Sequence, residues 1–325
     1  MGDLITKIKK NFPDAGSIII HKSNPHIHLW PDADIKKIFF SIFSFKELCC
    51  LVRTIRGYKK NNYTIFCLQM APGSIQGFLF YSFLKKMNLA DYIVDFNIIN
   101  ADIITPPKGD YILDLHLNQL AELLKIEFPT DDYQLELPVS RSVRVHKVLN
   151  KKRLIGLHPW SRRGHIKSFI WPFAKWLVLA RNLLSEHPDI KFVVFGKDKG
   201  FNKFKDYIIK HCNRTVTDRF CFSYSNSVHE LINTIDRCDT IITVNTAVVH
   251  IGYALRKEMF ILNGPSLDLW VPKNDNIYVI RDNQALFQTS DKWEKDECFA
   301  SLDRIKTDNV LSAINMAWVN HRSPH

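Results

Sequence analysis

Between Thr240 and Leu262 the chain reads TIITVNTAVVHIGYALRKEMFIL, which is an apolar run, a short helical segment and a second apolar run. Thr240 to Val244 and Met259 to Leu262 are typical of buried strands in a parallel sheet. Ala247 to Leu255 lies between them, where a crossover helix is expected. This strand–helix–strand unit predicts an α/β fold built on a parallel sheet.

The same alternation precedes this unit. Arg153 to His158 and Lys191 to Gly196 are expected to be two further buried strands. A helix beginning near Pro172 lies between them, since apolar residues recur there at helical spacing until His187 and the proline that follows it. The pattern therefore adds a second strand–helix–strand unit.

Two more helices complete this half of the chain. Ser227 begins a helix that runs through Cys238, and Glu230 three residues later forms a capping box with it. Asp303 to Val319 is expected to form a terminal helix. The resulting order of strand, helix, strand, helix, strand, helix, strand predicts a nucleotide-binding doubly wound domain.

Short apolar runs also alternate with helical segments in the first half. The expected strands are Ser17 to His21, Lys37 to Phe40, Thr64 to Gln69, Tyr92 to Phe96 and Ile103 to Thr105. Leu113 to Phe128 has apolar residues on one helical face and closes this half. The polar segment from Thr130 to Asn150 is the expected linker. We therefore predict one domain over residues 1–146 and a second over residues 147–325.

Composition and charge restrict the class of protein and its partners. The 325 residues exceed what one hydrophobic core supports, and 46% hydrophobic with 24% charged residues is typical of a folded protein. Lys and Arg outnumber Asp and Glu by 44 to 33, and the net charge of +11 attracts phosphate-bearing partners. Since the sequence has no basic tail, zinc-finger spacing or aromatic RNA-binding box, nucleic acid is the disfavoured partner. An anionic membrane face and a phosphorylated glycolipid stay open.

Cysteine usage and hydropathy indicate a cellular compartment. The seven cysteines include no CxxC pair and are odd in number, which favours a reducing environment over a disulfide framework. No window approaches the roughly 18 apolar residues of a membrane-spanning helix, and the first residues lack an apolar signal stretch. We expect a cytoplasmic protein, and contact with a membrane surface stays open.

The candidate site lies at the carboxyl ends of the strands, where open parallel sheets bind ligands. The loops of interest therefore follow His158, Gly196, Val244 and Leu262. Asn245 and Thr246 precede a helix whose free N–H groups would point at a phosphate, and Thr246 adds a hydroxyl. His250 lies one helical turn later on the same face. The alternative is that Thr246 only caps the helix and His250 only packs.

Two other groups of residues are candidates for the same edge. The loop after His158 gathers the polar and cationic residues Ser161, Arg162, Arg163 and Lys167, where a pyrophosphate would lie. Charge runs of this kind are also typical of a solvated loop. Gly196 and Gly264 follow strands and would let the backbone approach a ligand, although each is equally consistent with a simple turn.

Four blocks of sequence together resemble glycosyltransferase family 9, which includes the lipopolysaccharide heptosyltransferases. The blocks are Gly156 to Pro159 with Lys167 and Trp171-Pro172, then Phe192 to Gly196, then Ile242 to His250 with Ala254-Leu255, then Asn263 to Ser266 with Trp270 and Pro272. The third block is the most specific, because the family usually has an Asp-Ser/Thr-Gly-x-x-His run before a small-residue helix and a Gly-Pro-Ser/Thr turn.

The resemblance implies a GT-B type fold of two facing Rossmann-like domains, with the acceptor in the first domain and an ADP-sugar in the second. It implies no metal or other cofactor. The donor would be a nucleotide-sugar, with heptose as the first candidate, and the acceptor an anionic glycolipid such as the lipopolysaccharide core. The family inverts the anomeric centre by direct displacement, in which a carboxylate takes the acceptor's proton and positive groups stabilise the departing diphosphate.

The resemblance also assigns roles to residues of this chain. Lys167 would hold the diphosphate during the reaction, Thr246 and Ala247 would bind it through the helix start, and His250 would support the pocket. The remaining donor-site residues would be Ser161, Gly196, Asn245 and Gly264. Asn245 stands where the family usually has Asp, and Ala247 where it has Gly, which leaves donor recognition open.

The first domain departs further from the family, whose members begin with a strand followed by a Gly-Asp that carries the catalytic base. Here the chain starts at Met1-Gly2-Asp3, so that strand is expected to be absent, or the sequence to begin at an internal start codon. Asp3 is the candidate base; a remnant, a coincidence or a helix-capping acid is the alternative. His116 is the acceptor-side candidate, with helix-surface packing as its alternative. Basic residues among aromatics in the first 60 positions would suit an anionic glycolipid at the inner membrane face.

Two other functions compete with a transferase. A catalytically impaired relative would keep the nucleotide-sugar pocket as a binding or assembly module, as the substitutions at Asn245 and Ala247 and the shortened front suggest. An NAD-dependent oxidoreductase of the same domain type is disfavoured, because no Gly-x-Gly-x-x-Gly follows any predicted strand.

Overall fold

The computed structural model describes residues 17–21, 35–39, 45–61, 65–68, 82–94, 153–161, 169–197, 199–264, 270–282 and 301–320. The chain divides into two compact units, Met1–Gln134 and Leu135–His325. The expected boundary at residues 146 and 147 and the expected linker lie outside the described residues.

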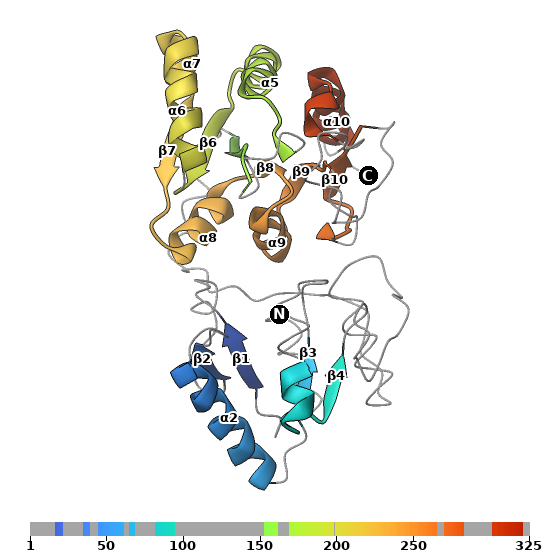
Figure 1. The fold of residues 1–325 in the computed structure, drawn as a ribbon. Helices are drawn as coiled ribbons and strands as arrows, with labels where there is room; N and C mark the ends of the chain where they lie inside the picture. The colour runs from blue at the N-terminus through green and yellow to red at the C-terminus, as the bar shows by residue number, and fades with distance from the viewer. Residues whose placement is uncertain are drawn as a thin grey trace. The chain divides into compact units, whose positions relative to one another are not determined.

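Short parallel strands and helix α2 (Phe45–Lys60) characterise the first unit (Figure 1). The parallel pairs are β1 (Ser17–His21) with β2 (Ile35–Phe39), and β3 (Phe66–Leu68) with β4 (Tyr92–Val94). These four strands confirm four predicted ones, with ends shifted by at most two residues. The predicted strand at Ile103 to Thr105 and the predicted helix at Leu113 to Phe128 fall outside the described residues.

Six parallel strands form the sheet of the second unit, in the order β10-β9-β8-β5-β6-β7. They are β5 (Leu154–His158), β6 (Lys191–Gly196), β7 (Phe220–Tyr224), β8 (Thr240–Val244), β9 (Glu258–Leu262) and β10 (Ile277–Ile280). Counted from β5, this is the doubly wound order 3-2-1-4-5-6. The order reverses between β5 and β8, so the carboxyl ends of these two strands mark the position at which such sheets bind ligands.

Helices cover both faces of this sheet (Figure 1). One face carries α5 (Phe173–Glu186), α6 (Lys199–His211) and α10 (Thr307–Asn320), and the other carries α8 (Val228–Arg237) and α9 (Ala247–Ala254). The short helix α7 (Arg214–Thr217) follows α6, and a 3₁₀ turn at Leu302–Arg304 precedes α10. Large side chains fill the interior, among them Trp171, Trp176, Phe192, Phe204 and Phe260.

The predicted element order of this unit was incomplete. The sequence interpretation passed directly from β6 to the helix at Ser227, whereas α6, α7 and β7 lie between them, and β10 follows β9. Strands β7 and β10 are the two edges of the sheet, and their residues are only partly buried. Both are nonetheless apolar runs, FCFSY in β7 and IYVI in β10, so the sequence contained the signal for each of them.

The predicted capping box at the start of α8 is confirmed with one shift. The Glu230 backbone N donates to Ser227 Oγ at 3.1 Å, as expected for an N-cap serine. In return Glu230 Oε2 accepts from the backbone N of Asn226, at 2.6 Å, one residue before the cap. Two N–H groups at the helix start are thereby bonded, which fixes where α8 begins.

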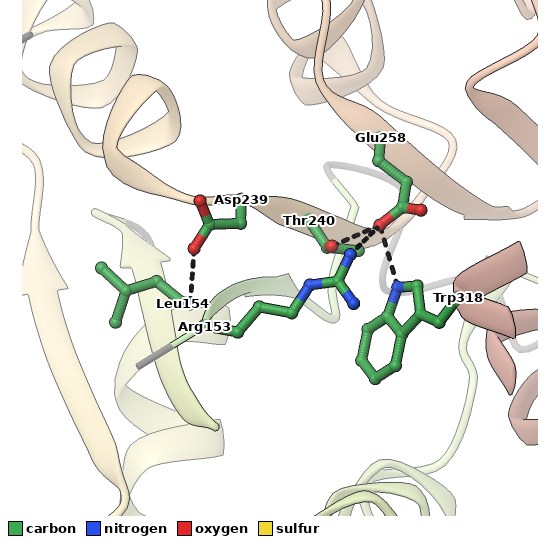
Figure 2. Close-up of polar contacts among 6 residues, drawn as sticks. All are labelled: Arg153, Leu154, Asp239, Thr240, Glu258 and Trp318. Carbon is green, nitrogen blue, oxygen red and sulfur yellow. Dashed lines mark hydrogen bonds and ion pairs between the residues drawn. The ribbon is translucent and has the colours of Figure 1, made fainter. Parts of the chain in front are cut away.

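A carboxylate joins the amino ends of three strands to helix α10 (Figure 2). Glu258 Oε2 accepts hydrogen bonds from Arg153 Nη2 at 3.1 Å, from Thr240 Oγ1 at 2.5 Å and from Trp318 Nε1 at 2.9 Å. The Arg153 guanidinium also lies 4.0 Å from the centroid of the Trp318 ring. Because one oxygen serves three donors, this cluster stabilises the amino edge of the sheet.

Two other acidic side chains close the same edge. Asp239 Oδ2 accepts from the backbone N of Leu154 at 2.9 Å, next to the cluster (Figure 2). Asp236 at the end of α8 pairs with Lys257, at 3.2 Å, and the Lys257 side chain is only 6% exposed. These interactions hold the starts of β5 and β9 against neighbouring segments.

Candidate functional site

The reversal of strand order brings the loop after His158 beside the loop after Val244. The two strands pair in parallel, with His158 opposite Thr243. The buried Thr243 hydroxyl donates to the carbonyl of Val244 at 2.9 Å and lies 3.3 Å from that of His158. The candidate residues Ser161 and Thr246 are therefore on loops that leave adjacent strands.

Thr246 is the N-cap of helix α9. Its backbone is extended, and its Oγ1 accepts from the backbone N of Val248 at 3.3 Å. The alternative interpretation of this residue, a helix cap, is thus confirmed. The cap uses a lone pair of the oxygen, so the hydroxyl hydrogen is a separate donor at the helix start. Ala247 is the exposed first residue of α9.

His250 lies on α9 one turn after Thr246, as the spacing predicted. It is partly buried, and desolvation lowers its pKa to about 4. At neutral pH the imidazole is therefore uncharged. Any contribution of His250 to anion binding comes from hydrogen bonding and not from positive charge.

Asn245 is bound to a residue at the end of the neighbouring strand. Its Nδ2 donates to Asn263 Oδ1 at 3.1 Å, and Asn263 is only 1% exposed. The backbone N of Asn263 in turn donates to the carbonyl of Ile280 at 3.0 Å. Family 9 proteins, which the sequence resembles, usually have a carboxylate at this position. Here the amide of Asn245 is hydrogen-bonded to a second amide, that of Asn263, at the neighbouring ends of β8 and β9. Gly264 follows directly and is buried.

The last residue of β5 and the loop after it hold three buried polar atoms that lack hydrogen-bond partners. Within the described part of the chain, these are His158 Nδ1, Trp160 Nε1 and Ser161 Oγ. A buried donor or acceptor without a partner costs about 1–3 kcal/mol, and native proteins contain few of them. A ligand or water that bonds these atoms would recover that cost, and Ser161 was already a predicted binding residue.

Trp160 packs in a slot made by two glycines. It is 7% exposed, and a Cβ added at Gly196 would lie 2.6 Å from its Cζ2, while one at Gly200 would lie 2.5 Å from its Cγ. Gly196 also has a φ of +149°, a conformation that other residues rarely adopt. The missing side chain at Gly196 is therefore explained by the turn and by Trp160. A close approach to a ligand is not needed to account for it.

His158 is held between two aromatic rings. Its centroid lies 4.8 Å from that of Trp160 and 5.8 Å from that of Phe195. Burial lowers the pKa of His158 to about 4, so the ring is neutral at pH 7. A neutral imidazole can either donate or accept at Nδ1, depending on its tautomer.

A fourth polar atom without a partner lies at the end of β7. Ser225 is 3% exposed, its backbone N donates to the carbonyl of Gly196 at 2.9 Å, and its Oγ has no partner among the described residues. Polar atoms of His158, Trp160, Ser161 and Ser225 that have no partner among the described residues therefore gather at the carboxyl edge. This concentration marks the edge as the candidate binding site.

Sequence reasoning missed Trp160, Ser225 and Asn263 as members of this site. Trp160 stands between two recognised residues, but its basic surroundings suggested a solvated loop. Ser225 ends a strand that the sequence interpretation did not include. Three predicted site residues, Asp3, His116 and Lys167, fall outside the described residues, as do Arg162 and Arg163.

The described segments show neither a cluster of metal ligands nor a membrane-spanning helix. Among the described side chains, no three His, Cys, Asp or Glu residues are grouped so that they could hold a metal ion. None of the helices described for this chain combines the length and the apolar character needed to cross a bilayer.

A doubly wound parallel sheet with polar residues at its switch point defines the class as a Rossmann-like α/β domain. Residues 104–297, more than half of the 325, match the family model described as glycosyltransferase family 9 (heptosyltransferase). The chain therefore belongs to glycosyltransferase family 9, and it is a glycosyltransferase.

Solved structures confirm the predicted fold class, α/β of GT-B type. E. coli ADP-heptose lps heptosyltransferase II matches with a TM-score of 0.67 at 16% identity, over 99% of this chain and 95% of that one. The glycosyl transferase family 9 protein of Veillonella parvula DSM 2008 matches with a TM-score of 0.73 at 15% identity, over 98% and 93%. E. coli heptosyltransferase WaaC, solved with ADP-2-deoxy-2-fluoro heptose, gives 0.61 at 12%, over 97% and 94%. No curated protein matches the sequence.

Proposed function

We propose that this glycosyltransferase moves a sugar, heptose in the first instance, from an ADP-sugar to a lipopolysaccharide core or a related surface glycan. We further propose that the reaction inverts the anomeric centre and needs no metal ion. The domain over residues 147–325 would bind the donor and the domain over residues 1–146 the acceptor. A cytoplasmic enzyme at the inner membrane face would meet both substrates.

The observation that carries the donor assignment is the set of unpartnered polar atoms at the carboxyl edge. Trp160 Nε1 is a donor, and the hydroxyls of Ser161 and Ser225 can each donate. Thr246 adds a hydroxyl hydrogen at the start of α9, where the helix dipole favours negative charge. A nucleoside diphosphate presents the complementary group, since its phosphate oxygens only accept hydrogen bonds.

Two matched structures favour an ADP-sugar as the first donor to test. E. coli heptosyltransferase WaaC has been solved with ADP and with ADP-2-deoxy-2-fluoro heptose. The likeness of the present enzyme to WaaC, at 12% identity, is a likeness of fold.

The chemistry proposed is a single displacement. The acceptor hydroxyl oxygen forms a bond to the anomeric carbon as the bond from that carbon to the diphosphate breaks. Asp3 would take the hydroxyl proton, and Lys167 with the start of α9 would stabilise the charge that develops on the departing ADP. His250 and His158, being neutral, would add hydrogen bonds without competing for that proton. His116 would orient the acceptor.

The amide pair of Asn245 and Asn263 supports a second candidate, a relative that binds nucleotide-sugar without transferring it. In that case, the carboxylate usual at position 245 would have been replaced because catalysis no longer requires it. Donor binding is expected under both candidates, so only turnover separates them.

Calorimetric titration with ADP and with ADP-heptose tests the donor site. Binding is expected to weaken about tenfold in Lys167→Ala and in Thr246→Val, because each change removes one bond to the diphosphate. Thr217→Val is the matched control, because it removes a hydroxyl at the end of α7 that donates to the carbonyl of Asn213. ADP affinity should not change in this variant. Absence of nucleotide binding by the native protein would reject the site.

Turnover then tests the reaction. Native protein should release ADP when given ADP-heptose and a heptose-deficient lipopolysaccharide core, with undiminished rate in EDTA. Asp3→Asn should abolish transfer while ADP still binds. ADP binding without transfer to any core acceptor would favour the non-catalytic candidate, and loss of rate in EDTA would contradict metal independence.

A further inference from the structure

The solvent-facing side of helix α2 carries a row of cations. Arg53, Arg56 and Lys60 are all exposed and recur at spacings of three and four residues. Leu51 and Ile55, at 0% and 3% exposure, lie on the opposite side of the helix. The three basic side chains therefore form one stripe, set apart from the packed face of α2.

A neighbouring segment adds two more exposed cations to the same unit. Lys59, near the end of α2, donates to the carbonyl of Asn88 at 3.2 Å and pairs with Asp91 at 2.7 Å. These bonds hold residues 82–91 against α2, and that segment exposes Lys85 and Lys86. Met87 beside them is 42% exposed. We call Arg53, Arg56, Lys60, Lys85 and Lys86 the α2 basic surface.

Few acidic residues accompany these cations in the described segments around α2. Of the residues described in segments 45–61, 65–68 and 82–94, Glu47 and Asp91 are the acids. Asp91 is already engaged by Lys59 and by the backbone N of Ile65, at 2.7 Å. In these described segments the basic residues therefore outnumber the acidic ones, in addition to the protein's net charge of +11.

We propose that the α2 basic surface docks the enzyme on an anionic phospholipid membrane. From Arg53 to Lys60 the stripe extends over roughly 10 Å of the helix, at about 1.5 Å per residue, and a flat layer of anionic headgroups can meet all three cations. Basic residues next to an anionic bilayer attract it additively, and an exposed methionine among them can enter the headgroup region. The docking is independent of the donor site, since it requires no nucleotide.

Sedimentation with lipid vesicles tests this surface in the full-length protein. Native protein should bind vesicles of phosphatidylcholine with phosphatidylglycerol, and not phosphatidylcholine alone. The triple variant Arg53→Gln, Arg56→Gln, Lys60→Gln should partition roughly a hundredfold more weakly. The matched control neutralises three exposed cations of α6 and α7, Lys203→Gln, Lys210→Gln and Arg214→Gln, and should retain binding.

A charge-keeping variant, Arg53→Lys with Arg56→Lys, should bind as the native protein does, because positive charge is what the membrane attracts. Circular dichroism and thermal denaturation of the triple variant check that it is folded. ADP affinity should be the same in all variants. The membrane proposal can therefore fail while the donor proposal stands, and the donor proposal can fail while the membrane proposal stands. Equal losses of vesicle binding in the two triple variants would mean that only the net charge of the protein matters, and this result would overturn the proposal. Failure of native protein to bind anionic vesicles would also overturn it. The proposal would likewise be overturned if the α2 triple variant lost binding to an oligonucleotide but kept binding to vesicles, because the surface would then bind nucleic acid and not membrane.

Discussion

The two ends of the C-terminal sheet differ in how their main polar side chains are bonded. At the amino edge a single oxygen of Glu258 accepts three hydrogen bonds, and Lys257 is paired with Asp236. At the carboxyl edge Trp160, His158, Ser161 and Ser225 each bury a polar atom without a partner among the described residues.

This difference shows how one sheet separates stability from binding. The charged bonds of the amino edge join β5, β8, β9 and α10 and contribute to folding whether or not a ligand is present (Figure 2). The unpartnered atoms of the carboxyl edge cost folding energy until something bonds them. Substitutions at the amino edge should therefore change stability, and those at the carboxyl edge should change affinity.

The largest expected effect is at the amino edge. Glu258→Ala would leave Arg153, Thr240 and Trp318 with donors that lack their acceptor, at a cost of about 3–5 kcal/mol in the free energy of unfolding. Urea denaturation measures this loss. The exposed Asp206→Ala is the control and should change stability by less than about 0.5 kcal/mol. Normal stability with lost ADP affinity in Glu258→Ala would contradict the separation of the two edges.

A second prediction concerns the slot that holds Trp160. Gly→Ala in a helix normally stabilises, by about 1 kcal/mol. At Gly200 the new Cβ would lie 2.5 Å from Trp160 Cγ and 2.9 Å from its Cβ, so Gly200→Ala should instead destabilise by about 2 kcal/mol. Gly57 in α2 has nothing within 4 Å, and Gly57→Ala should stabilise. Thermal denaturation should show shifts of opposite sign; two upward shifts would mean that the tryptophan is not confined by Gly200.

The buried His158 predicts a loss of stability in acid. Its pKa is about 4 in the folded protein against about 6.5 in the unfolded chain, so only the unfolded state takes up a proton between these values. Stability is complete above pH 6.5 and falls as pH decreases toward 4, by about 2 kcal/mol at pH 5. His158→Phe removes this contribution. From pH 7 to pH 5 the free energy of unfolding, measured in urea, should therefore fall by about 2 kcal/mol more in the native protein than in His158→Phe. Equal losses in the two proteins would contradict the burial of the ring.

Local sequence was sufficient to predict the elements nearest the site. The unit from Thr240 to Leu262 formed as a strand, a helix and a strand, and Thr246 and Ser227 cap their helices. These features depend on neighbours within a few residues. Hydrophobic spacing and capping chemistry act over that range, so a single sequence contains them.

The contacts that distinguish the two edges could not be predicted in the same way. Trp160 is confined by Gly200, forty positions along the chain, and Glu258 meets Trp318 sixty positions later. Asn245 finds its amide partner only because β8 and β9 are adjacent. Such pairs follow from the order of strands in the sheet, and the omission of β7 hid Ser225 as well.

One substitution made at both edges gives the most direct comparison, although its expected effects are the smallest. Trp318→Phe removes the indole donor to Glu258, a bond of 2.9 Å, and should lower stability by about 1–2 kcal/mol without altering ADP affinity.

Trp160→Phe removes an indole N–H that has no partner in the described part of the protein. Removing a buried donor that has no partner offsets the packing lost with the smaller ring, so the free energy of unfolding should change by less than about 1 kcal/mol. ADP affinity should fall about tenfold, because the N–H is then no longer available to the ligand. Urea denaturation and calorimetry on both variants measure the two effects. Unchanged ADP affinity in Trp160→Phe would mean that an ordered water, and not the nucleotide, satisfies the indole, and the donor site would then rest on Thr246 and Ser161.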